Sequence, residues 1–90
     1  MATYVIIFEL KHARLRSYQR FYESIQAYDS VEIKDSFYLI ETSLSTNRLF
    51  SELERCLHDD DTLFIAEFVE KPNWTKTLPG SPAWIDARFP

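Results

Sequence analysis

The order of elements is decided by residues 30–42, which read Ser-Val-Glu-Ile-Lys-Asp-Ser-Phe-Tyr-Leu-Ile-Glu-Thr. Apolar residues alternate with charged ones over 31–34, and a second apolar run covers 37–42 after the polar pair Asp35-Ser36. Two strands separated by so short a break can only be antiparallel neighbours. The pair is not the Asn-Gly or Asp-Gly signal of a two-residue hairpin, so the turn type stays open.

Strand and helix patterns flank this hairpin. Residues 3–10 are β-branched and aromatic in an almost continuous run, which predicts a central strand covered on at least one face. Residues 14–28 and 46–58 carry apolar side chains at three- and four-residue spacing, which predicts two amphipathic helices. Ser45 is the expected N-cap of the second helix, and residues 62–69 form the last strong strand.

The predicted order is therefore β-α-β-β-α-β, an α+β two-layer sandwich of the ferredoxin-like type over residues 1–69. We expect residues 3–9 to form a central strand, with 37–42 and 63–69 as its neighbours and the first and third strands in the middle. We also expect the fourth strand to pair with the second.

A C-terminal tail, residues 70–90, departs from this pattern. It contains all four prolines and the only glycine of the chain, yet it is too apolar for a frayed terminus. We expect it to pack on the domain or on a partner subunit. The candidate interface residues in it are Trp74, Trp84, Ile85 and Phe89.

Composition bounds the function further. The 90 residues are 46% hydrophobic and 27% charged, which is typical of a globular domain. The net charge of -4 excludes a uniformly basic nucleic-acid-binding surface. The single cysteine, Cys56, cannot form an internal disulfide. Neither a signal peptide nor a membrane-spanning run is recognisable, so we expect a cytoplasmic protein with no membrane association.

Motifs of catalysis are sparse. The two histidines and the cysteine lack zinc-ligand spacing, the run Asp59-Asp60-Asp61 lacks the pattern of a calcium loop, and we expect no metal site or cofactor. Glu9, near the end of the first strand, could bind a metal or act as a general base. The alternative, a solvated acid at a strand end, is favoured by the pattern.

A basic stretch follows the first strand. Lys11, Arg14, Arg16 and Arg20 lie within ten residues that contain no acid, so they could contact phosphate groups. A solvated helix surface is the favoured alternative, because phosphate binding depends on many summed charges and the protein is acidic overall.

Three segments resemble the small SinR-like family, which is similar to the Cas-two family of CRISPR-associated proteins. They are residues 4–10, the opening strand; residues 35–42, followed by Ser45; and residues 59–65, a turn and strand. Trp74 falls where such chains often carry a tail tryptophan. The resemblance implies a ferredoxin-like homodimer with tails that can cross to the partner subunit.

The resemblance also implies two activities: a structural bridge for an integrase, or a metal-dependent nuclease with an aspartate at the end of the first strand of each subunit. Here Glu9 stands at that place and Phe8 precedes it, which weakens the nuclease prediction. We favour a homodimeric, non-enzymatic module that binds a macromolecule, protein rather than nucleic acid. The alternatives are a Mg- or Mn-dependent nuclease with paired Glu9 carboxylates and a phage- or plasmid-encoded inhibitor of a host protein.

Overall fold

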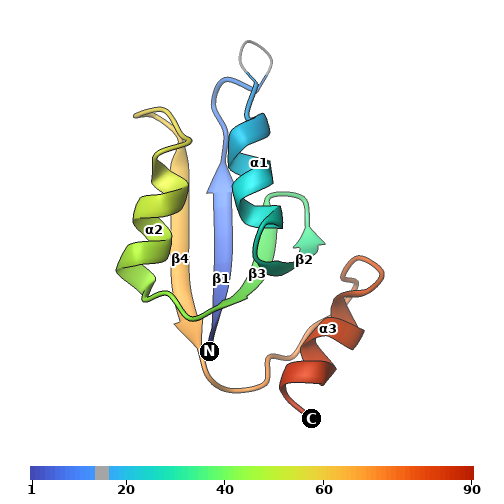
Figure 1. Ribbon diagram of the computed structural model, residues 1–90. Helices are drawn as coiled ribbons and strands as arrows, with labels where there is room; N and C mark the ends of the chain where they lie inside the picture. Colours follow the sequence, from blue (N-terminus) through green and yellow to red (C-terminus); the bar gives the residue numbers. More distant parts are fainter. Residues whose placement is uncertain (14–16) are drawn as a thin grey trace.

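A four-stranded antiparallel sheet is the centre of the computed structural model, which describes residues 1–13 and 17–90 (Figure 1). The α+β class is confirmed. The elements in chain order are β1 (Ala2–Glu9), α1 (Gln19–Gln26), β2 (Asp29–Lys34), β3 (Phe37–Thr42), α2 (Thr46–Glu54), β4 (Thr62–Phe68) and α3 (Ser81–Arg88).

The strands are arranged in the order β2-β3-β1-β4. β1 pairs with both β3 and β4, so its predicted central position is confirmed. The expectation that the fourth strand pairs with the second is wrong, because β2 and β4 lie at opposite edges. β3 has β2 on one side and β1 on the other, so neither side of β3 is free. The chain that leaves β3 through α2 therefore returns as β4 on the free side of β1.

The hairpin between β2 and β3 turns at Asp35-Ser36, where Ser36 adopts a positive φ of 62°. Serine is uncommon in this left-handed region, which explains why the sequence carried no standard turn signal. The backbone carbonyl of Ser36 accepts a hydrogen bond of 3.1 Å from the N–H of Phe8, which ties the turn to β1.

Both predicted helices are shorter than expected. Over the described residues α1 begins at Gln19 rather than residue 14, and residues 14–16 lie outside the described ranges. α2 begins after Ser45, whose hydroxyl accepts a 3.2 Å hydrogen bond from the N–H of Arg48, so the predicted cap is confirmed. It ends at Glu54 because the next N–H groups bond to carbonyls three residues back and tighten the chain into a turn.

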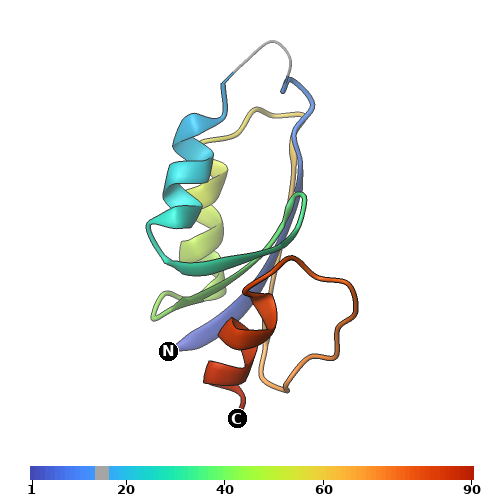
Figure 2. The ribbon, with the colours of Figure 1, turned by 90° about the vertical axis from the view of Figure 1, so that its right-hand side faces the viewer.

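The main core lies between the sheet and the two helices α1 and α2, which cover the same face (Figure 2). Side chains alternate across β1, so that every second residue from Tyr4 to Phe8 enters this core. The helices contribute fully buried side chains to it, namely Phe21, Ile25, Leu49 and Leu53.

The tail lies against the opposite face of the sheet and along β2 (Figure 2). Ile85 of α3 is only 2% exposed and packs with Ile33 and Leu39. The sequence pattern did not predict this helix, because it is short and follows Gly80 (φ 92°) as its N-cap, with a proline in its first turn. Proline is tolerated there because the first helical N–H groups have no intrahelical acceptor.

Candidate functional site

A polar cluster forms where β1 ends and β4 begins, with the Asp61 carboxylate at its centre. Oδ1 accepts hydrogen bonds of 2.9 Å from the backbone N–H of Lys11 and from the hydroxyl of Tyr18. Oδ2 accepts one of 2.8 Å from the N–H of His58. Burial alone would raise the pKa of Asp61, but the hydrogen bonds favour the charged form and leave its pKa below the ordinary value.

The two histidines lie beside this carboxylate. The Nε2 atom of His12 is 2.7 Å from a carboxylate oxygen of Asp60, and the His12 and His58 rings meet edge to face at 5.7 Å. The sequence spacing does not predict this contact, because His12 follows β1 and His58 lies in the loop before β4. Over residues 1–13 and 17–90, no three His, Cys, Asp or Glu side chains are grouped so that they could hold a metal ion.

Glu9 lies at the end of β1 and is exposed. Its Oε1 atom is 2.7 Å from Nζ of Lys11, and both side chains are more than half accessible to solvent. The hydrogen bond and charge of Glu9 raise the pKa of the Lys11 ammonium. Glu9, the candidate catalytic carboxylate, is thus held in a solvent-exposed ion pair. It lies beside the Asp61 cluster but makes none of the hydrogen bonds to Asp61.

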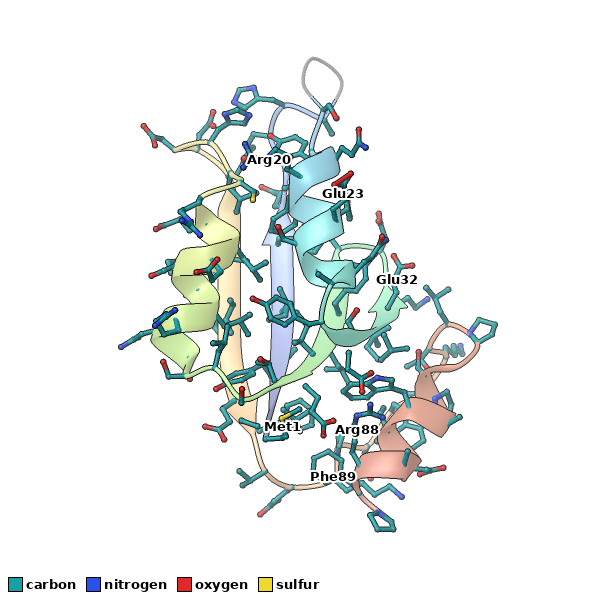
Figure 3. The ribbon with its side chains drawn as sticks, in the orientation of Figure 1. Met1, Arg20, Glu23, Glu32, Arg88 and Phe89 are labelled. Carbon is teal, nitrogen blue, oxygen red and sulfur yellow. The ribbon has the colours of Figure 1, made fainter. Side chains whose placement is uncertain are left out.

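The basic residues are only partly placed. Lys11 lies in the turn after β1, and Arg20 lies on the first turn of α1 (Figure 3). Arg20 lines an open pocket of 560 Å³ with Arg55 and His58 between α1 and the end of α2. Arg14 and Arg16 lie outside the described residues, so the structure does not place the four cations on one surface.

A second feature, absent from the predicted site, is an apolar row on the sheet face opposite α1 and α2. Strand pairing sets Ile7 of β1 directly between Phe64 of β4 and Phe37 of β3. Phe64 is 56% exposed and Ile7 is 43% exposed, because the tail covers only the other half of this face. We call Phe64, Ile7 and Phe37 the apolar row.

No protein-family model matches the chain, and a comparison with curated proteins finds no relative. None of the helices in the described ranges has the length and apolar content needed to span a membrane.

The tail residues predicted as an interface contact the chain's own sheet. Arg88 points from α3 toward the strands (Figure 3), forms ion pairs with Asp29 and Glu41, and stacks 3.8 Å from the ring of Trp84. The Phe89 ring stacks on Phe68 at 5.6 Å. With Ile85 buried, the tail is an internal cover for one half of the sheet face.

The apolar row was detectable in the sequence. Strand residues 62–69 and 3–10 are apolar at both odd and even positions, so each strand presents apolar side chains to both faces. The 21 tail residues, 70–90, do not cover all of the second face, because they pack on its β2 side and on the half that carries Val5 and Phe68.

Proposed function

We propose that this protein is a ferredoxin-like, Cas-two-like homodimeric module that binds another protein and has no enzymatic activity of its own. The observation that supports the proposal is the apolar row, in which two large side chains from adjacent strands stand exposed side by side. Contiguous exposed apolar surface on a small domain marks an interaction site. The order β2-β3-β1-β4 fits the ferredoxin-like topology.

A second copy of the chain is the occupant that we propose for the apolar row, and the surface area of the chain is large enough for such an interface. The chain exposes 6000 Å², about 500 Å² more than the about 5,500 Å² expected for a folded protein of 10.7 kDa. Its radius of gyration of 13.1 Å also exceeds the about 12.2 Å expected for 90 residues. The excess area is of the same order as the about 800 Å² that each partner buries in a stable interface.

A face-to-face dimer is self-complementary in this arrangement. A two-fold axis between two stacked sheets, running along the row and so perpendicular to β1, lays the apolar row of one copy on that of the other and sets the two tails on opposite sides of it. The row itself contains no charged side chain, and Glu9, the next residue on the same face of β1, is ion-paired with Lys11.

Light scattering of the purified chain tests the dimer. We expect a particle of twice the chain mass of 10.7 kDa at micromolar concentration. Phe64→Lys places a charge in the row and should give a monomer. Val69→Lys is the matched control, because Val69 is 80% exposed but lies outside the row, and it should stay dimeric. A wild-type particle of one chain mass contradicts the proposal.

A further inference from the structure

The two edge strands of the sheet, β2 and β4, differ in whether another segment covers them. The β2 edge is occupied by the tail: the N–H of Leu78 donates to the carbonyl of Ile33 at 3.0 Å, and the Ser81 hydroxyl donates to that of Glu32 at 3.0 Å. Ser81 is fully buried in making this contact. The tail therefore caps the edge at which another strand could have been added.

The β4 edge has no such cover. β4 pairs with β1 on one side, and no other segment of the described residues hydrogen-bonds to Thr62–Phe68. An edge strand with unpaired N–H and C=O groups is a template for an added strand. Native proteins usually shield such edges. Within residues 1–13 and 17–90, one edge of this sheet is shielded and the other is left open.

The charges beside β4 indicate what kind of strand fits. Asp59 and Asp60 precede β4, and Glu67 and Glu70 lie at its other end, all of them exposed. Between them β4 carries Phe64, which is exposed on one face of the sheet, and Leu63 and Ile65, which are partly buried against the helix-side core. The edge is thus apolar in the middle and acidic at both ends.

A second copy of β4 fits this charge pattern less well than a basic strand. Antiparallel self-pairing centred on Ile65 sets Asp60 of each copy opposite Glu70 of the other, and only the next pair, Asp59 opposite Lys71, is attractive. Like charges directly opposite destabilise a strand pair. A strand with lysine or arginine at both ends replaces these repulsions with attractions.

We propose that the β4 edge binds an extended segment of another protein, with alternating branched apolar residues in its middle and basic residues at both ends. The segment adds as a fifth strand beside β4, so main-chain hydrogen bonds provide affinity and the flanking acids provide selectivity. This inference names the partner class of the proposed protein-binding module and so rests on that function. It does not require the dimer, because an added strand pairs with the free main-chain groups of β4 at the sheet edge, whereas the dimer uses side chains on the sheet face; Phe64 is the residue that the two surfaces share.

The test uses a fluorescein-labelled synthetic peptide of nine residues, with Val-Thr-Val-Thr-Val in the middle and two lysines at each end. We measure its anisotropy with the full chain at low and high salt. A second peptide has the same sequence with alternate backbone nitrogens methylated on the pairing edge. A third replaces the lysines with glutamates. We expect at least tenfold weaker binding for both, and weaker binding of the first peptide in high salt.

Variants of the chain locate the site. The double change Glu67→Lys and Glu70→Lys should weaken binding of the lysine peptide about tenfold. The double change Glu23→Lys and Asp35→Lys is the charge-matched control, because both residues are exposed and lie on α1 and at the β2–β3 turn, away from the β4 edge. It should change the affinity less than twofold. In hydrogen exchange, the bound peptide should slow the amides of residues 62–68 and leave those of β2 unchanged.

The outcomes separate the two proposals. Equal binding of the methylated peptide, no binding of any peptide, or protection outside residues 62–68 overturns this inference. A monomeric chain that still binds the first peptide at β4 supports the inference and contradicts the homodimer. A dimeric chain that binds the methylated peptide equally well contradicts the inference alone.

Discussion

The hydroxyl of Tyr18 donates a hydrogen bond of 2.9 Å to Oδ1 of Asp61, although 43 residues separate the two in sequence. The bond fastens the chain before α1 to the loop between α2 and β4. We expect Asp61→Ala to lower the free energy of unfolding by about 2 kcal/mol, because three donors lose their acceptor. Chemical denaturation measures this. Asp59→Ala, at an exposed neighbouring carboxylate, should change it by less than about 0.5 kcal/mol.

The same carboxylate sets part of the acid stability. The pKa of Asp61 is lower in the folded chain than its ordinary 3.8, so its contribution is present above that value and is lost as the pH falls through the folded pKa. Melting temperatures of wild type and Asp61→Asn should therefore differ most near neutral pH and converge in strong acid. A constant difference down to about pH 2 would show that the charge of Asp61 contributes nothing.

Backbone protection should follow the strand order. β1 and β3 are central, whereas β2 is an edge strand. We expect native-state hydrogen exchange to be slower at Ile6 and Leu39 than at Val31. Comparable rates at all three amides would count against the sheet order.

Glu9 provides the sharpest test of the nuclease alternative. If two Glu9 carboxylates converged on a metal ion, manganese would stabilise the folded chain by mass action. We expect no shift in melting temperature with magnesium or manganese, because Glu9 is already ion-paired with Lys11 in solvent. A rise of several degrees that disappears in Glu9→Gln, together with cleavage of RNA or DNA, would establish the nuclease instead.

The tail should be an integral part of the fold. Ile85 is buried against β2 and β3, and the Trp84 indole N–H donates a 3.0 Å hydrogen bond to Asp29. We expect Ile85→Ala to lower the free energy of unfolding by about 2–3 kcal/mol and to shift tryptophan emission to longer wavelength. Ala83→Ser, on the exposed side of α3, is the control and should change neither quantity. Unchanged emission in Ile85→Ala would show that the tail stays packed on the sheet without this contact.

Local patterns by themselves determined the order of the first six elements. The alternation over residues 31–34, the cap at Ser45 and the run over 62–69 each reflect short-range geometry, which a sequence displays directly. The helix ends were less visible, since i to i+3 bonds after α2 depend on where the following strand must begin. α3 was missed because its helical state depends on burying Ile85 against a sheet that is distant in sequence.

Only the tertiary structure decided which surfaces remain open. Sequence indicated that Glu9 ends a strand, but not that Lys11 pairs with it or that His12 meets His58. Sequence likewise showed Phe64 in a strand, without showing that the tail covers the β2 side of the sheet and stops short of Phe64. Exposure and edge position result from the path of the whole chain, and no local pattern of residues encodes them.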